Sequence, residues 1–134
     1  MNPSDTLLPH DAPWVVIKFG GTSVSTRSRW DNIASIAATH QAAGKRVLIV
    51  VSALSGITDQ LKAIGETPAD LARCSEVRDT IVARHQTLFG EMGLSRRNGV
   101  DAWMAKLDQL LADPRRDAGE LAWQAEVLAL GELT

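Results

Sequence analysis

Two short apolar runs with a helical pattern between them dominate the first part of the chain. Trp14–Ile17 (WVVI) and Val47–Val51 (VLIVV) are apolar at every position, which is typical of parallel strands covered by helices on both faces. Between these runs, apolar residues recur every three or four positions and predict a helix over about residues 26–43. A strand, a helix and a second strand in this order predict a right-handed βαβ unit, whose parallel strands end at the same edge of the sheet.

The remainder of the chain has a helical period only. Ile57, Leu61 and Ile64 predict a short amphipathic helix after the second strand. Two longer stripes predict a helical hairpin, with one helix over about residues 69–92 and the next over about residues 100–111. The segment 121–130 is apolar nearly all round, so its helix should be buried or should cover another surface.

Composition and charge narrow the possible partners. The 134 residues fit one domain, and a net charge of −2 provides no broad positive field for nucleic acid or an anionic membrane. No apolar run approaches the roughly 20 residues that cross a bilayer. Residues 1–13 lack the pattern of a secretory signal and predict a disordered lead-in before the folded part at 14–134. The single cysteine, Cys74, suits a cytoplasmic protein, and its place on a helical stripe predicts a packed thiol.

The first candidate for chemistry is Lys18, at the end of the first apolar run, with Gly20, Gly21, Thr22 and Ser23 directly after it. Open α/β sheets bind ligands at the carboxyl ends of their strands, and glycines have no Cβ to keep a phosphate from the backbone. Neither a Walker A loop nor a G-x-G-x-x-G motif is present. From these residues alone two interpretations stand equal: Lys18 contacts a phosphate, or it reaches from a strand end into water while the glycines form a turn.

Three segments in the same order carry a resemblance to a known family. They are VIKFGGTSV at 16–24, VSALSGITD at 51–59 and LGELT at 130–134, and together they resemble aspartokinases of the amino-acid kinase family. The resemblance implies an α/β fold: a partial three-layer αβα amino-acid-kinase (carbamate-kinase-like) fold with parallel strands 14–19 and 47–52, followed by a helical segment. It also implies ATP-dependent phosphorylation of the L-aspartate β-carboxylate, which belongs to lysine, threonine and methionine biosynthesis.

The resemblance also assigns roles to single residues. It implies that Lys18 stabilises the transferring phosphoryl group and that Thr58 and Glu132 contact the aspartate. The nucleotide-binding residues that it implies are Lys18, Gly20, Gly21, Thr22, Ser23, Ser52 and Ala53. Without the resemblance, Thr58 would be a helix cap or first-turn residue, and Glu132 a surface charge. ATP would arrive with Mg²⁺. No metal held by the protein alone is expected, since the three histidines, His10, His40 and His85, lack the spacing of metal ligands.

The resemblance covers the chain after Pro13 and implies the N-terminal, substrate-side portion of a catalytic domain. The other active-site residues and the regulatory ACT modules would then belong to a C-terminal part, in a full-length enzyme that forms homo-oligomers. The helical stretch 68–114 resembles the insertion of longer aspartokinases, including bifunctional fusions. We therefore expect residues 1–134 to be inactive alone. The alternatives are a non-catalytic module that binds an anion or amino acid, and a kinase with another acceptor, such as glutamate, acetylglutamate or a nucleoside monophosphate. The loop 52–59 and Glu132 favour aspartate.

Overall fold

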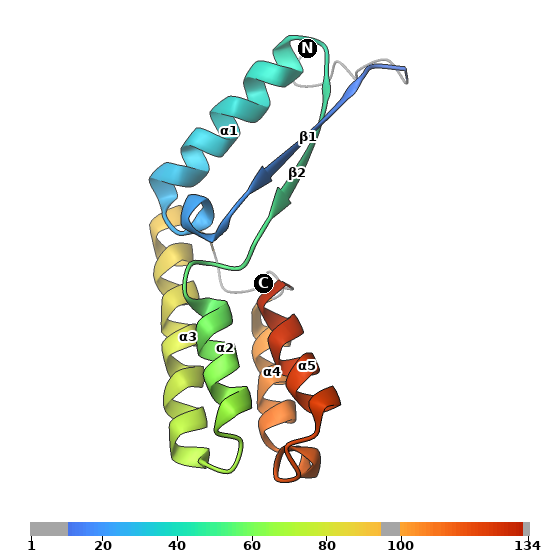
Figure 1. The fold of residues 1–134 in the computed structure, drawn as a ribbon. Coiled ribbons are helices and arrows are strands. Elements are labelled where there is room, and N and C mark those ends of the chain that lie inside the picture. The colour runs from blue at the N-terminus through green and yellow to red at the C-terminus, as the bar shows by residue number, and fades with distance from the viewer. Residues whose placement is uncertain (1–10, 95–99, 133–134) are drawn as a thin grey trace.

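A computed structural model describes residues 11–94 and 100–132, and in it two parallel strands pair over their whole length (Figure 1). Strand β1 is Trp14–Phe19 and strand β2 is Arg46–Val51, with Trp14 opposite Arg46 and Phe19 opposite Val51. The prediction of two parallel strands is confirmed, with β2 one residue earlier than expected. The predicted lead-in at 1–13 lies largely outside the described residues; at its end, the Pro13 carbonyl accepts a hydrogen bond from the Arg46 amide.

The predicted helices are present within a few residues of their expected bounds. They are α1 (Arg27–Ala42), α2 (Ile57–Glu66), α3 (Leu71–Met92), α4 (Val100–Leu111) and α5 (Leu121–Ala129), with short 3-10 turns η1 (Gly21–Val24), η2 (Pro114–Arg116) and η3 (Leu130–Glu132). Helix α3 begins two residues later than predicted because the Asp70 side chain caps it, accepting from the Arg73 amide at 2.9 Å. Every described helix is too short or too polar to cross a bilayer.

Helices α2 to α5 pack in a ring beyond the sheet, since α2 contacts α3 and α5, and α4 contacts the same two helices. Their apolar stripes meet inside this ring. The core residues include Leu61, Ile64, Cys74, Val77, Ile81, Leu107, Leu110, Trp123 and Val127. The Cys74 thiol is 1% exposed, and burial raises its pKa, so the predicted packed thiol is confirmed.

The sheet differs from the prediction of strands covered on both faces. Helix α1 packs against β2, but Trp14 and Val16 on β1 are 61% and 62% exposed, and Leu48 on β2 is 49% exposed. Consecutive apolar residues on a strand project to opposite faces, and within the described part of the chain only one of these faces has a helix over it. The apolar runs identified the strands correctly. Burial of both faces would also need a layer over the face that carries Trp14, Val16 and Leu48.

The last helix is also less buried than its composition suggested. Trp123 and Val127 of α5 are fully buried against the other helices, whereas Leu121 is 81% exposed and Leu128 is 38% exposed. Helix α5 therefore packs through one stripe of residues spaced four positions apart, and apolar residues on its outer face stay exposed.

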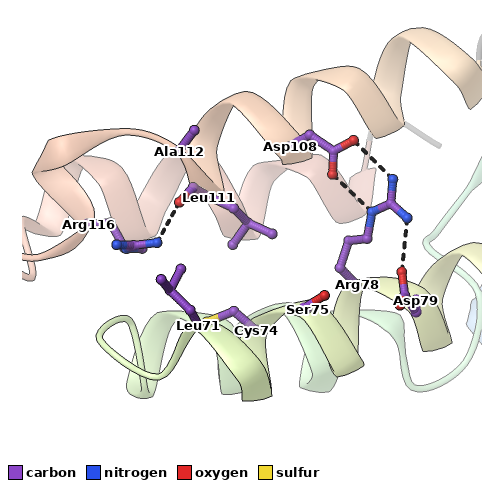
Figure 2. A pocket seen from close by; sticks show the side chains of 9 residues that line it. All are labelled: Leu71, Cys74, Ser75, Arg78, Asp79, Asp108, Leu111, Ala112 and Arg116. Carbon is purple, nitrogen blue, oxygen red and sulfur yellow. Dashed lines mark hydrogen bonds and ion pairs between the residues drawn. The ribbon is translucent and has the colours of Figure 1, made fainter.

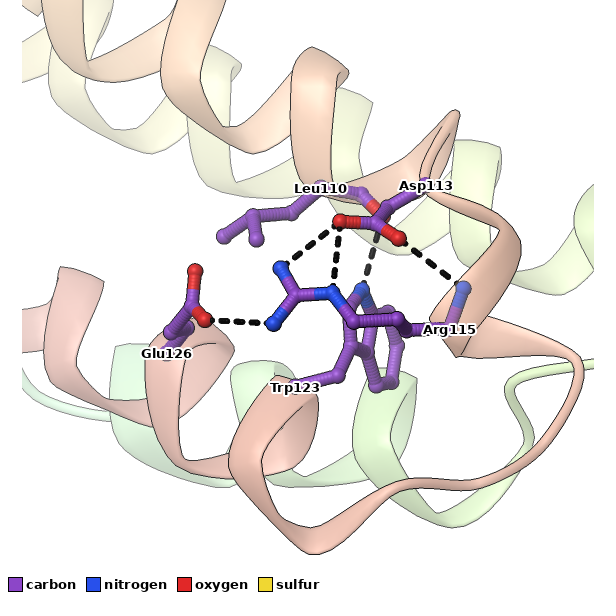
Figure 3. A network of polar contacts seen from close by, with 5 residues as sticks. All are labelled: Leu110, Asp113, Arg115, Trp123 and Glu126. Atoms are coloured by element: carbon purple, nitrogen blue, oxygen red, sulfur yellow. Dashed lines mark hydrogen bonds and ion pairs between the residues drawn. The ribbon is translucent and has the colours of Figure 1, made fainter.

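A polar network joins the end of α4 to α5 across η2 (Figure 3). Arg115 contacts the Asp113 carboxylate at 2.7 Å and Glu126 at 2.9 Å, and the Asp113 carboxylate also accepts from the Arg115 amide. The hydrogen bonds from Arg115 hold the pKa values of Asp113 and Glu126 below their usual range and raise the pKa of Arg115. Close by, the Trp123 indole donates to the Leu110 carbonyl at 2.8 Å. These contacts set the direction in which α5 returns along α4.

His85 on α3 is a buried polar side chain. It is 4% exposed, its Nδ1 lies 2.8 Å from the Ile81 carbonyl, and its ring packs on Trp103 with centroids 5.4 Å apart. Its Nε2 atom has no hydrogen-bond partner within the part of the chain that the structure describes. Burial is the largest cause and disfavours the imidazolium. The Ile81 contact raises the pKa and the charge of Arg84 lowers it, so that on balance the pKa of His85 lies below its ordinary value of 6.5.

We expect this burial to make the fold weaker in mild acid. Well above pH 6.5 His85 is neutral in both folded and unfolded chains; as the pH falls through that value, the unfolded chain takes up the proton first. The free energy of unfolding should therefore decrease from pH 7.5 towards pH 5.5, measured by urea unfolding. The His85→Leu variant should lose part of this dependence, and His40→Leu, on α1, should retain it. An unchanged slope in the His85 variant would contradict the assignment.

Candidate functional site

The residues singled out from the sequence gather where the two strands end. Lys18 is the penultimate residue of β1, paired in register with Val50, and its side chain is exposed on the same face as Trp14 and Val16. The strand pairing continues one step further, because the Ser52 amide donates to the Phe19 carbonyl at 3.1 Å. Lys18 and Ser52 therefore occupy the same edge of the sheet, as the βαβ pattern predicted.

Beyond the strands, the glycine loop and the loop after β2 are in direct backbone contact. A methyl group placed on Gly21 would lie 2.6 Å from the Ala53 carbonyl oxygen, closer than Cβ atoms come in folded proteins, and 3.1 Å from the Ser55 nitrogen, a tight contact. A methyl group on Gly20 would meet nothing within 4 Å. Gly21 is thus needed for the close approach of the two loops, whereas Gly20 borders open space.

The third segment reaches the same place from the far end of the chain. A methyl group on Gly131 would lie 3.6 Å from the Thr58 hydroxyl and 3.7 Å from Cβ of Ala53. Turn η3 is anchored from behind, since the Trp103 indole donates to the Leu130 carbonyl at 2.6 Å. The three motif segments, separated by up to more than a hundred positions, therefore meet at one edge of the sheet (Figure 1).

The remaining candidates fall around this meeting point. Thr22 is exposed on η1, and Ser23, half-buried, donates its amide to the Gly20 carbonyl at 2.9 Å. Thr58 is exposed in the first turn of α2; Gly56 is the N-cap, so Thr58 is not the helix cap. Glu132 is the last residue of η3, and its side chain lies outside the described part. The backbone thus brings all the predicted segments together.

A separate cavity of about 520 Å³ opens between α3 and α4, away from these loops (Figure 2). Its cationic groups are already paired. Arg78 makes two bonds of 2.9 Å to the Asp108 carboxylate and one to Asp79, and these raise its pKa. Arg116 donates to the Leu111 carbonyl and to Asp117. An anion would have to displace these carboxylates, so the cavity does not compete with the strand edge as a phosphate site.

The described residues contain no group of three or more histidine, cysteine, aspartate or glutamate side chains that could hold a metal ion. The donors gathered at the strand edge are instead a lysine, glycine amides and hydroxyl groups. This set suits the oxygen atoms of an anion rather than a metal cation.

Comparison with known proteins identifies the family. The model of the amino acid kinase family matches residues 13–132. The chain belongs to the amino acid kinase family. The aspartokinase of Chlamydia muridarum is 31% identical over 120 residues, which are 88% of this chain and 24% of that protein. A bifunctional aspartokinase/homoserine dehydrogenase of Daucus carota is 43% identical over 54 residues, 40% of this chain and 6% of that protein.

Among solved structures, the chain is similar to E. coli aspartokinase III in complex with aspartate and ADP. The two share 28% sequence identity with a TM-score of 0.67, covering 90% of this chain and 26% of that one. The resemblance to aspartokinases and the partial amino-acid-kinase fold predicted from the sequence are thereby confirmed. This member of the family spans about a quarter of the length of these two aspartokinases.

Some residues that shape the site carried no signal in the sequence. Ser25 follows the glycine motif directly and bonds to both loops, and Trp103 anchors η3 although it belongs to a helical stripe. Both act through contacts with backbone far away in the chain, which periodicity does not reveal. Ser55 is bound to the Ser25 hydroxyl through its amide.

Proposed function

We propose that this chain forms the substrate-side part of an aspartate kinase, which transfers the γ-phosphoryl group of ATP to the β-carboxylate of L-aspartate. The observation that carries the proposal is the meeting of the three motif segments at the edge where β1 and β2 end. The similarity to E. coli aspartokinase III, crystallised with aspartate and ADP, supports both substrates.

In this proposal the chain acts by position and charge. The aspartate carboxylate, with an ordinary pKa of about 3.9, is ionised at neutral pH and attacks without a general base. A new bond forms between a carboxylate oxygen and the γ-phosphorus, the bond to the β,γ-bridging oxygen breaks, and ADP leaves. Lys18 contacts the nucleotide phosphates, including the β-phosphate that ADP keeps, and stabilises the charge on the transferring γ-phosphoryl group. Gly20, Gly21, Thr22, Ser23, Ser52 and Ala53 also line the phosphates. Thr58 and Glu132 hold the aspartate. Mg²⁺ arrives with ATP, held by phosphate oxygens.

Residues 1–134 supply only part of this machinery, and we propose that they bind ADP weakly but do not turn over alone. The chain spans about a quarter of the length of the two aspartokinases compared above, and we assign the rest of the active site, the regulatory ACT modules and the contacts for homo-oligomers to additional sequence of the kind those proteins have. The biological setting that we propose is amino-acid biosynthesis, lysine included, in the cytoplasm.

Binding of ADP to the chain tests the role of Lys18. In a titration with Mg²⁺ and ADP followed by amide NMR shifts, Lys18→Ala should weaken ADP binding about tenfold to a hundredfold, because a charge-assisted contact contributes roughly 1.5–3 kcal/mol. The matched control is Lys45→Ala, which removes a lysine directly before the first residue of β2, at the end of the sheet away from the site. This variant should bind ADP as the parent does. Equal affinities in both variants, or an absence of binding to the parent chain, would refute the phosphate site.

An activity assay tests the division of labour. With ATP and L-aspartate, trapping β-aspartyl phosphate as a hydroxamate should give no signal above background for residues 1–134. A signal that is abolished by Lys18→Ala would show that the chain is catalytically sufficient. Tight binding of aspartate alone, unaffected by Lys18→Ala, would favour a non-catalytic amino-acid-binding module instead.

A further inference from the structure

The hydroxyl of Ser25 joins the two loops of the proposed phosphate site. Ser25 directly follows η1, and its Oγ donates to the Gly21 carbonyl at 2.6 Å. The same oxygen accepts the amide of Ser55 from the loop after β2, at 3.0 Å. One side chain thus bonds to the backbone of both loops, and one of its partners, Ser55, lies 30 positions along the chain.

This bridge is one of two hydrogen bonds between the loops. Within the described residues, segments 19–25 and 52–56 are joined by the Ser52 amide, which donates to the Phe19 carbonyl, and by the Ser55 amide on Ser25. The first continues the strand pairing, so beyond it the Ser25 bridge is the one hydrogen bond among the described residues that ties the second loop to the glycine loop. The loops touch closely at Gly21 and Ala53, but such a contact limits approach without preventing separation.

We propose that Ser25 is a positioning residue for the phosphate site: it holds the loop 52–55 against the glycine loop in the arrangement that receives the nucleotide phosphates. The inference rests on the proposed function of that edge. A serine hydroxyl has a single hydrogen, which Ser25 gives to the Gly21 carbonyl, so it has none to donate to a phosphate. Ser25 acts through the two loops rather than on the substrate.

The bridge also explains why Ser55 matters by its backbone alone. Its amide directly precedes Gly56, the residue with a φ of +85° at which helix α2 begins. Fixing that amide fixes the peptide between Leu54 and Ser55 and, through it, the path of Ser52 and Ala53 towards the strand edge. Without Ser25 this amide would turn to water, and the loop would sample more arrangements.

The test compares variants of Ser25 in the same ADP titration. Ser25→Ala removes both hydrogen bonds, of which the one to Ser55 joins the loops. It should weaken ADP binding about fivefold, the effect of losing that one joining bond, and should speed hydrogen exchange at the Ser55 amide. Ser25→Thr keeps the hydroxyl and should retain both the affinity and the slow exchange. The matched control is Ser28→Ala, since the Ser28 hydroxyl contacts only Thr26 among the described residues; it should change neither measurement.

The outcomes separate this inference from the proposed function. If Lys18→Ala weakens ADP binding but Ser25→Ala does not, the positioning role is refuted and the phosphate site stands. If Ser25→Ala and Ser25→Thr weaken binding equally while the Ser55 amide stays protected, side-chain packing rather than the hydroxyl is responsible, and the inference is again refuted. If Lys18→Ala has no effect, or the parent chain does not bind ADP, the phosphate site fails and Ser25 has no site to position.

Discussion

Replacing Trp123 by alanine should destabilise the protein by about 3–5 kcal/mol, the usual cost of removing a large aromatic side chain from a core. Trp123 is fully buried on α5, in the ring of helices formed with α2, α3 and α4. Its removal leaves a cavity that backbone held by hydrogen bonds cannot easily close. Since domains of this size are stable by roughly 5–15 kcal/mol, the loss would be a large share of the total.

Two further variants separate packing from hydrogen bonding at this position. Trp123→Phe removes the bond to the Leu110 carbonyl but keeps much of the volume, and that carbonyl still accepts the Asp113 amide at 3.2 Å. It should therefore cost clearly less than the alanine variant. Leu121→Ala, on the same helix but 81% exposed, is the matched control and should change stability little. Urea unfolding followed by far-UV circular dichroism measures all three. Equal costs for Trp123→Ala and Leu121→Ala would contradict the assigned core.

The second large effect is expected at Gly21, with its neighbour Gly20 as an internal control. In Gly21→Ala the new methyl group would lie 2.6 Å from the Ala53 carbonyl oxygen, and since that atom is backbone, the loop after β2 must move. We expect a loss of about 1–3 kcal/mol in the free energy of unfolding, together with changed amide shifts at residues 52–56.

Gly20→Ala should leave stability within about 0.5 kcal/mol of the parent. Its methyl group meets nothing within 4 Å, and the backbone φ of −76° is one that alanine adopts readily. Two adjacent glycines of one motif are therefore expected to differ: one substitution costs stability and the other does not. Similar losses in both variants would mean that the loops do not approach at Gly21 as described.

The sequence predicted the elements well because their signals are local. Consecutive apolar residues marked β1 and β2, and the helical stripe predicted over residues 69–92 marked the buried face of α3, except that Leu71 is 56% exposed. Burial was predicted less well. Trp14 and Leu121 looked like core residues, yet both are exposed, since burial depends on which other elements lie against a face.

The sequence likewise predicted some features of the candidate site and left others undecided. The order of three short segments, with Lys18 before the two glycines, was enough to indicate the family, and the βαβ pattern placed Lys18 and Ser52 at one edge. Composition and spacing alone left Lys18 undecided between a phosphate ligand and a solvated strand end. Its proposed role comes from the resemblance, and the titration with ADP tests it.

The sequence by itself determined the strands, the helices, their parallel βαβ connection and the family, because each rests on periodicity or on a short motif. Only the tertiary structure decided that Gly21 touches the backbone of Ala53, that Gly131 reaches Thr58, and that Ser25 bridges the two loops. Except for the bond from Ser25 to Gly21, these contacts join residues 30 or more positions apart. They depend on how the helical ring places η3 and the loop after β2 against the end of the sheet. A single hydroxyl, or a glycine without a side chain, forms no periodic pattern, so the sequence does not predict its distant partner.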